Sequence, residues 1–244
     1  MKTKYFLLAG VLLITAAVPA LAQQNTIRFG VTNIQPHSSA GDFSGNGPAA
    51  FTPPGSSLYV RDKTTAFFSY SREINDNWDV ELALGVPPTH DVILKVNTAN
   101  PALNAAFNGQ KGATVQQIAP TLFANYKFLE KSSAFRPFVG VGINYTRFGQ
   151  YNVTDAGNQL NCGGGAIPGC GPSSLSMSDS WGLALQAGAT YKFTKEWSMT
   201  VSVATAQVKS TITTNTPTAV GNIQRNADIK FNPVALTIAA GYSF

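Results

Sequence analysis

Bulky apolar side chains recur at every second position along eight separate segments of this chain. A period of two is that of a β-strand, whose side chains point alternately to the two faces of a sheet. The segments are residues 26–35, 64–73, 78–87, 117–128, 136–148, 179–193, 197–209 and 228–244. The pattern predicts an all-β fold with eight antiparallel strands.

One of the two rows in these segments contains no Asp, Glu, Lys or Arg. It includes Val80, Leu122, Val141, Leu183, Leu185, Val201 and Ile238. The opposite row is small or polar, as at Gly30 and Thr190. Charged residues make up only 12% of the chain, against roughly 25% in soluble domains. The apolar row is therefore predicted to face lipid. A soluble lipocalin-like barrel is the alternative, but its bulky residues point inward and its outer face is charged.

The connections between the segments alternate in length. Residues 74–77, 129–134 and 194–196 form short turns, and the other connections are long. Aromatic residues fall at the short-turn ends of the segments: Trp78, Tyr126, Phe128, Tyr191, Phe193, Trp197, Tyr242 and Phe244. Together these features predict an eight-stranded antiparallel transmembrane β-barrel of the bacterial outer membrane, with short periplasmic turns and long extracellular loops. We expect the last strand, which ends in Phe244, to be read by the outer-membrane assembly machinery.

The first 22 residues have the pattern of a secretory signal peptide. Lys2 and Lys4 precede an apolar run, and Ala20-Leu21-Ala22 forms a small-x-small cleavage signal. The barrel domain is therefore predicted to be residues 23–244, and no later apolar run of about 20 residues predicts a spanning helix. Lys and Arg (17) exceed Asp and Glu (12) only modestly and are scattered, so no nucleic-acid partner is expected.

Two cysteines, Cys162 and Cys170, flank a glycine-rich segment. In an oxidising compartment this segment is flexible enough to close on itself, which predicts a disulfide. A metal site is the alternative, but no histidine lies near and Cys-x7-Cys is not a zinc spacing. No metal is expected.

Six charged residues of the inward row cluster toward the short-turn end: Arg28, Glu73, Asp79, Glu81, Lys127 and Lys192. Isolated charges are unfavourable in a narrow interior, so these groups are predicted to pair with one another as a polar plug. A purely structural pairing is the alternative, and it is compatible with a plug.

Inward positions become apolar toward the other end. Phe67, Phe123, Phe148 and Val208 are the predicted lining of an apolar lumen above the plug. A solute stopped by the plug would leave sideways, and Pro87, Pro88 and Pro120 flank one strand pair without a backbone N–H to donate. We interpret Pro87 and Pro120 as marking a lateral gate; the alternative is that these prolines only end strands beside a loop.

Enzymatic function is not indicated. The histidines, His37 and His90, lie at predicted strand-to-loop junctions, and His90 with Asp91 is interpreted as a loop hydrogen-bond feature. The glycines of Gly140-x-Gly142 and of residues 163–165 lack the strand-to-helix setting and the lysine of a phosphate cradle. No cofactor is expected.

Several segments resemble the OmpW family of small outer-membrane barrels, and the resemblance spans the mature chain. They are residues 76–82, Pro88-Thr89-His90-Asp91, residues 135–146, residues 180–188 and Gly241-Tyr242-Ser243-Phe244. The glycine-rich cysteine segment departs from the family pattern. The resemblance implies an eight-stranded barrel that passes small hydrophobic molecules across the outer membrane.

The predicted function is passive uptake of small hydrophobic molecules past the lipopolysaccharide layer, with lateral release into the lipid bilayer. The alternative is a structural or adhesive barrel that acts through its extracellular loops without transport.

Overall fold

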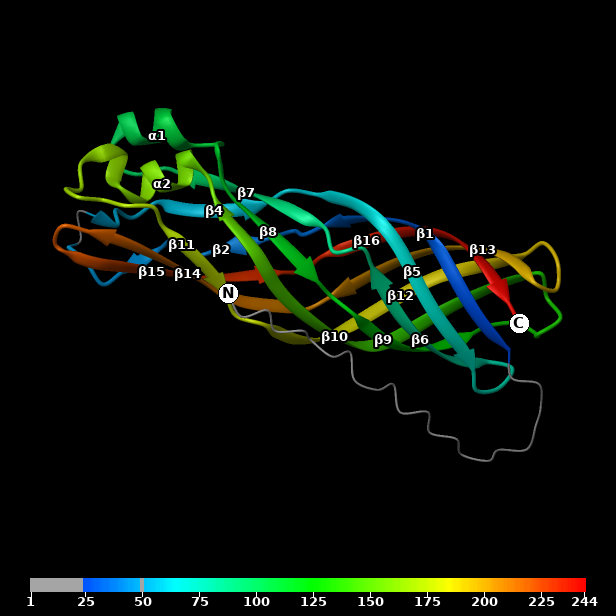
Figure 1. The fold of residues 1–244 in the computed structure, drawn as a ribbon. Coiled ribbons are helices and arrows are strands. Elements are labelled where there is room, and N and C mark those ends of the chain that lie inside the picture. Colours follow the sequence, from blue (N-terminus) through cyan, green and yellow to red (C-terminus); the bar gives the residue numbers. More distant parts are fainter. Residues whose placement is uncertain (1–23, 49–50) are drawn as a thin grey trace, which may run out of the picture.

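The computed structural model describes residues 24–48 and 51–244, so the predicted signal peptide lies outside the described residues. The chain forms an elongated β-structure, with a closed barrel at one end and two short helices at the other (Figure 1). We call these the short-turn end and the far end. The described residues include no helix that is long and apolar enough to cross a membrane.

Eight strands form the barrel, which confirms the predicted fold class. Their spatial order is β1 (Asn25–Gln35), β5 (Lys63–Glu73), β6 (Trp78–Gly85), β9 (Thr121–Lys127), β10 (Phe135–Val153), β12 (Ser180–Lys192), β13 (Trp197–Ala206) and β16 (Val234–Ser243). The first and last strands pair from Thr26↔Ser243 to Gln35↔Val234 and close the ring. Closure pairs the strand edges that an open sheet would expose.

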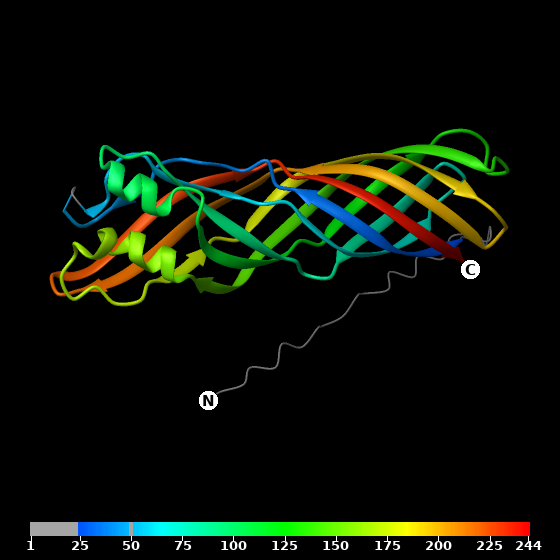
Figure 2. The same ribbon diagram turned by 90° about the horizontal axis from the view of Figure 1, so that it is seen from above.

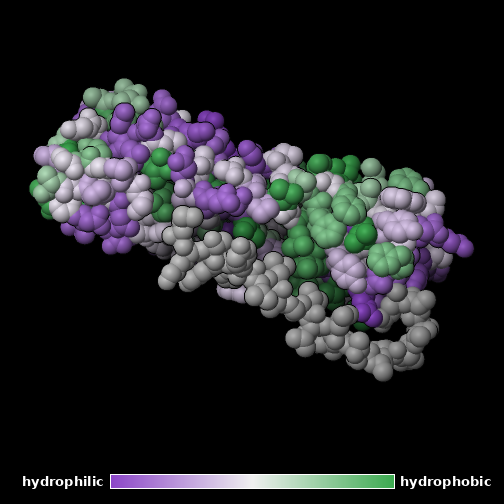
Figure 3. Space-filling view, viewed as in Figure 1, coloured by the Kyte–Doolittle hydropathy of each residue, from purple (hydrophilic) through white to green (hydrophobic). Residues whose placement is uncertain are grey.

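The bulky row faces outward, as the sequence predicts. Leu183 is 62% exposed and Val141 is 53% exposed, whereas inward neighbours such as Ser69 and Asn125 are buried. Figure 3 shows apolar side chains gathered over the barrel and hydrophilic ones over much of the far end. Exposed apolar residues without charges are the outer surface expected of a barrel in lipid.

Aromatic rings bound this apolar band. At the short-turn end, ring centroids lie 5.2 Å apart in the pair Trp78–Tyr126 and 5.1 Å apart in Trp197–Tyr242. At the other margin Trp181 packs on Tyr145 at 4.7 Å. Strand β12 carries the chain from one margin to the other over a dozen residues, which is about 30 Å for a tilted strand. That span matches the hydrocarbon core of a bilayer.

Local side-chain bonds explain the short turns. The Asn75 side-chain oxygen accepts hydrogen bonds from the N–H groups of Asn77 and Trp78, both at 2.9 Å. The Thr194 hydroxyl accepts from the N–H of Glu196 at 3.1 Å and of Trp197 at 3.0 Å. Asn and Thr commonly satisfy turn N–H groups in this way, which fixes a tight connection between strands.

The far end is ordered, where the sequence predicts long loops. Strands there are β2 (Ser39–Ala40), β3 (Ser44–Gly45), β4 (Ser56–Val60), β7 (Thr89–Val96), β8 (Lys111–Ile118), β11 (Ser174–Met177), β14 (Val208–Thr218) and β15 (Gly221–Phe231). The barrel sheet continues through β8, β7 and β4, and a second sheet has the order β11-β14-β15-β2, with β3 paired to β15. The barrel wall therefore extends beyond the apolar band as two sheets.

Three predicted segments are each divided between two strands. The segment 117–128 is divided between β8 and β9 at Ala119-Pro120, the segment 197–209 between β13 and β14 at Gln207, and the segment 228–244 between β15 and β16 at Asn232-Pro233. The two prolines lack the N–H that a continuous ladder needs. At Gln207 the backbone N–H still donates to the Leu183 carbonyl of β12 at 2.9 Å, so this residue ends the pairing of β13 with the barrel before β14 begins.

Two helices cover the far end: α1 (Pro101–Phe107) and α2 (Asp155–Asn161) (Figures 1 and 2). Asn100 caps α1 by accepting from two N–H groups of its first turn, and Thr154 caps α2. After α2, Gly163–Gly165 form a single 3-10 turn. The predicted disulfide between Cys162 and Cys170 is present and closes this segment.

Candidate functional site

Five of the six predicted plug residues meet inside the barrel near the short-turn end. Arg28 donates to Glu81 at 3.1 Å. The Lys127 ammonium lies 2.8 Å from Asp79 and 3.2 Å from Glu73. The backbone alternation brings these charges inward from β1, β5, β6 and β9. Both signs are present in a buried cluster, as stable burial of charge requires.

Two amide side chains join the charged pairs into one network. The Asn125 amide donates to Asp79 at 2.8 Å and to Glu81 at 3.0 Å. The Gln186 amide donates to Glu81 at 3.0 Å and to the Asn125 oxygen at 2.6 Å. Gly140 makes room for this contact, because a Cβ there would lie 2.1 Å from the Asn125 oxygen. We call Arg28, Glu73, Asp79, Glu81, Asn125, Lys127 and Gln186 the polar network.

Lys192, the sixth predicted residue, forms no ion pair among the residues that the structure describes. Two basic residues missing from the prediction act at the same end. Lys131, in the turn after β9, lies 3.0 Å from Glu73. Arg136 is buried and donates to the carbonyls of Asp76 at 2.7 Å and Leu129 at 3.2 Å, which ties two turns together. The sequence did contain a signal for Arg136: it alternates with Pro137 of the outward row, so its side chain is expected to point into the barrel.

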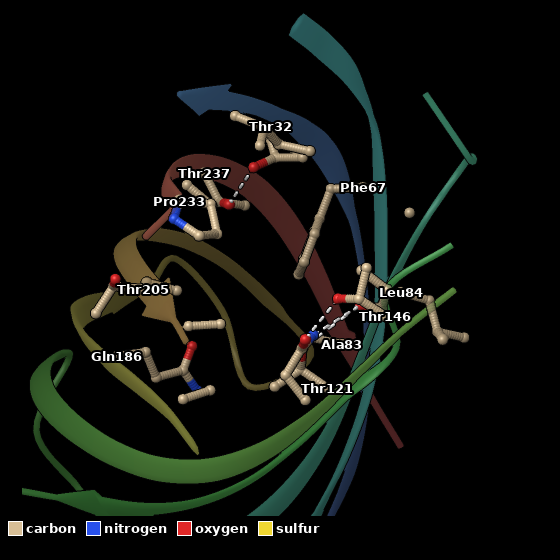
Figure 4. A pocket seen from close by; sticks show the side chains of 18 of the residues that line it. Thr32, Phe67, Ala83, Leu84, Thr121, Thr146, Gln186, Thr205, Pro233 and Thr237 are labelled. Atoms are coloured by element: carbon tan, nitrogen blue, oxygen red, sulfur yellow. Dashed lines mark hydrogen bonds between the residues drawn. The ribbon is translucent and has the colours of Figure 1, made fainter. Parts of the chain in front are cut away.

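An apolar pocket of about 150 Å³ lies above the polar network. Phe67, Phe123 and Val208, three of the four predicted lining residues, contact it, and Gln186 of the network is at its boundary. In Figure 4 the Phe67 ring stands inside the ring of strands. The pocket can hold an apolar group of about the size of benzene, which occupies an engineered cavity of similar volume.

Several polar side chains of this pocket are hydrogen-bonded to one another. The hydroxyls of Thr237 and Thr32 lie 3.0 Å apart. Asn144 donates to the Thr121 hydroxyl at 2.8 Å and accepts from Thr146 at 2.7 Å. Because these groups are already satisfied, an apolar solute takes no hydrogen-bond partner from them.

A packed cluster separates the pocket from the far end. Phe148, the fourth predicted lining residue, belongs to it, and its ring centroid lies 5.8 Å from that of Phe231. The buried members are Leu58, Val92, Ala113, Val115, Phe148, Val208, Ile212, Ile229 and Phe231, which we call the neck. The cavity beside Phe148 measures only about 20 Å³. The neck therefore leaves space for no more than a water-sized molecule in this conformation.

One seam in the barrel wall lacks ladder bonds. The pairing of β6 with β9 ends at Ala83↔Thr121. The next backbone bond across this boundary runs from Gln117 to Pro88, at 3.0 Å. We call residues 84–87 and 118–120, which lie between, the seam. The apolar pocket contacts both of its edges, at Leu84 and Gly85 on one side and Ala119 on the other.

The two predicted gate prolines have different positions relative to the seam. Pro87 lies on one edge, directly after Val86, whose N–H donates to the Ala66 carbonyl on β5. Pro120 accepts a bond from Tyr145 on β10 at 3.1 Å. Because a bonded antiparallel pair exchanges bonds in both directions, the N–H that Pro120 lacks would also face β10. The missing N–H of Pro120 therefore removes no bond across the seam. The reason given for interpreting Pro120 as a gate residue is wrong.

His90 lies within β7 and is buried, so its prediction as a loop feature paired with Asp91 is wrong. Its ring Nδ1 lies 3.2 Å from the Arg61 carbonyl, to which it donates. Asp91 instead lies 3.4 Å from Lys111. Among the described residues, no group of three or more His, Cys, Asp or Glu side chains is placed to hold a metal ion.

Acidification is expected to loosen the sheet around His90. Burial holds the pKa of His90 below its ordinary value of 6.5, against the opposing bond to Arg61. The unfolded segment therefore takes up the proton first, and stability present above about pH 6.5 is lost as pH falls toward the lower folded pKa. Amide exchange of β7 and β8, corrected for intrinsic rates, should accelerate from pH 7.5 to 5.

His90→Gln should remove this pH dependence, and His37→Gln, at an exposed site, should keep it. Equal protection of the unaltered chain at both pH values would contradict the prediction.

Comparison with known proteins agrees with this architecture. The model of the OmpW family matches residues 24–244. Outer membrane protein W of Vibrio cholerae is 28% identical, over 96% of each chain. The dibenzothiophene metabolism operon protein DoxH of Pseudomonas sp. strain C18 is 26% identical, over 93% of each. The crystal structure of the outer membrane protein OprG from Pseudomonas aeruginosa is 26% identical and superimposes with a TM-score of 0.75, covering 91% of this chain and 95% of that one.

These relatives place the barrel in the bacterial outer membrane. The short-turn end is accordingly periplasmic and the far end extracellular. The family match spans all the residues of the barrel and of its extracellular extension. The chain belongs to the OmpW family of outer-membrane β-barrel proteins.

Proposed function

We propose that this barrel takes up small hydrophobic molecules passively and releases them sideways into the bilayer through the seam. The single observation that carries the proposal is the contact of one apolar pocket with both edges of an unpaired stretch of barrel wall. The name of one relative, a protein of a dibenzothiophene metabolism operon, supports aromatic solutes as a class.

The proposed path has three parts. A solute crosses the neck as the Phe148 and Phe231 side chains move aside, and it enters the pocket against Phe67 and Phe123. Burial of its apolar surface is favourable by about 25 cal/mol per Å² removed from water. The polar network makes further descent unfavourable, because an apolar solute would break bonds among buried charges. The seam is then the route with the least polar surroundings.

The extracellular extension spans the lipopolysaccharide layer, so that the solute avoids its saccharides. The signal peptide, residues 1–22, directs export and is removed, and the strand that ends in Phe244 is bound by the assembly machinery during insertion. No covalent chemistry takes part, and no enzyme activity is proposed.

Gly85→Trp is expected to abolish most of the uptake that the protein provides. A Cβ at Gly85 would lie 3.4 Å from the Ala66 carbonyl and 3.8 Å from a Thr65 methyl, which are ordinary contacts. The indole would thus fit the backbone and fill the pocket beside the seam. The measurement is uptake of radiolabelled naphthalene by cells with intact surface saccharide, with the empty-vector strain as baseline.

Gly41→Trp is the matched control, because Gly41 is exposed at the extracellular end and a Cβ there meets nothing within 4 Å. It should leave uptake unchanged. If Gly85→Trp takes up naphthalene at the unaltered rate, release through the seam is wrong. If cells with and without the barrel take up naphthalene equally, the adhesive or structural alternative replaces transport.

A further inference from the structure

A second cavity, of about 240 Å³, is lined by residues of α1 and α2, the two helices at the extracellular end (Figures 1 and 2). We call it the outer chamber. Its apolar wall includes Leu58, Leu94, Leu103, Leu160, Ile167 and Leu175. Asn100 and Ala166 also line it and are exposed, so the chamber reaches the protein surface. It lies on the extracellular side of the neck, apart from the pocket beside the seam.

Arg225 on β15 brings a buried positive charge to this chamber. It is 4% exposed, and none of the ion pairs among the described residues includes it. Its guanidinium donates to the hydroxyls of Thr52 at 3.1 Å and Thr216 at 3.3 Å, and to the carbonyls of Phe51 at 2.9 Å and Asn161 at 2.8 Å. A guanidinium has five N–H donors, so one remains after these four neutral acceptors.

Thr214 on β14 lies directly opposite Arg225 in the β14–β15 ladder. It also lines the chamber and is 5% exposed. Its hydroxyl has no hydrogen-bond partner in the part of the chain that the structure describes. Cross-strand neighbours have Cβ atoms about 5 Å apart, so one small group can reach both side chains. A buried hydroxyl without a partner and a buried cation without an anion are each unfavourable beside apolar walls.

We propose that the outer chamber binds an amphipathic monocarboxylate, with the carboxylate held between Arg225 and Thr214 and the hydrocarbon body against the leucines. One carboxylate supplies both the missing negative charge and an acceptor for the free guanidinium N–H and the Thr214 hydroxyl. Burial lowers the pKa of Arg225, and no acidic side chain among the residues with described positions counters that effect.

The cavity volume limits the body of the ligand. Benzene occupies an apolar cavity of about 150 Å³, so the chamber suits a body somewhat larger. A two-ring aromatic acid and a medium-chain fatty acid share this chemistry. Sodium 2-naphthoate and sodium octanoate are the two probes, and methyl 2-naphthoate and 1-octanol are their uncharged counterparts.

Binding is measured by calorimetry on the full barrel in lipid nanodiscs, with empty nanodiscs subtracted. We expect saturable binding of at least one carboxylate and at least tenfold weaker binding of its uncharged counterpart. Whichever carboxylate binds shows whether the hydrocarbon body of the ligand is a chain or a ring system. If neither carboxylate saturates above the empty nanodiscs, or if a carboxylate and its counterpart bind equally, the proposal is overturned.

Thr214→Val is the decisive variant, because it removes an unpartnered hydroxyl at nearly constant shape and is expected to fold. It should weaken carboxylate binding by about tenfold or more, because that factor corresponds to the free energy of one hydrogen bond to a charged group. Thr213→Val, one position along the same strand and on its other face, should leave binding unchanged.

Arg225→Gln should abolish binding in barrels whose circular dichroism is unaltered. Unchanged binding in Thr214→Val would overturn the carboxylate position. Naphthalene uptake does not enter these measurements, so their failure leaves release through the seam untouched.

Discussion

Glu81→Leu is expected to lower the free energy of unfolding of the barrel by about 3–5 kcal/mol, the usual effect of removing one partner from a buried ion pair. Arg28 is 6% exposed and would keep its charge without the carboxylate 3.1 Å away. The amides of Asn125 and Gln186 would also lose an acceptor, since both donate to Glu81. Leucine fills the space but replaces none of these bonds.

The measurement is reversible urea unfolding in lipid vesicles, followed by tryptophan fluorescence. The double variant Arg28→Met with Glu81→Leu should be less destabilised than the sum of the single variants, because it removes the uncompensated charge. Lys131→Met is the control: this half-exposed lysine also lies near a network carboxylate, Glu73, which keeps Lys127 as a second cationic partner, so the loss is expected to be about 1 kcal/mol or less. Additive single effects would show that Arg28 and Glu81 do not stabilise each other.

The fold could be predicted from the sequence because lipid acts on every strand in the same way. An outward charge is unfavourable anywhere in the apolar band, so positions such as Leu185 and Val201 reveal their face by composition alone. No such rule acts on the extracellular extension. In β14, Thr214 and Thr216 are buried while Thr213 and Asn215 are not, so burial alternates there but polarity does not. The sequence of β14 therefore shows little alternation of polar and apolar residues, and it predicts a loop.

The charged members of the polar network were predictable from the sequence, but their amide members and the contacts among them were not. Arg28 and Glu81 could be placed inside the barrel at the same end, because parity and distance from the turns fix both properties. Their contact, however, depends on the stagger between β1, β5 and β6, which the alternation does not encode. The Gln186 bond to Glu81 spans 105 residues. The reason offered for Pro120 failed similarly, because which neighbour a backbone group faces depends on register.

A charge in the lipid-facing row should have the second largest effect. Val141→Arg is expected to destabilise the barrel by about 2–4 kcal/mol, the cost of arginine near the bilayer midplane. Val141 is 53% exposed and lies midway along the barrel part of β10, between Leu185 on β12 and Ala124 on β9. Its neighbours are apolar, so the guanidinium has no partner within the wall. Urea unfolding in the same vesicles measures the loss.

Depth separates this effect from a general intolerance of substitution. Phe193→Arg removes a larger side chain from a position that is at least as exposed, but at the aromatic margin, where the cost falls to about 0–1 kcal/mol. Val141→Thr, nearly the shape of valine without a charge, should likewise have a small effect. If Val141→Arg and Phe193→Arg are equally stable, the exposed row does not lie in hydrocarbon. Release through the seam would then lose its physical basis, since a solute leaving the pocket would meet water instead of lipid.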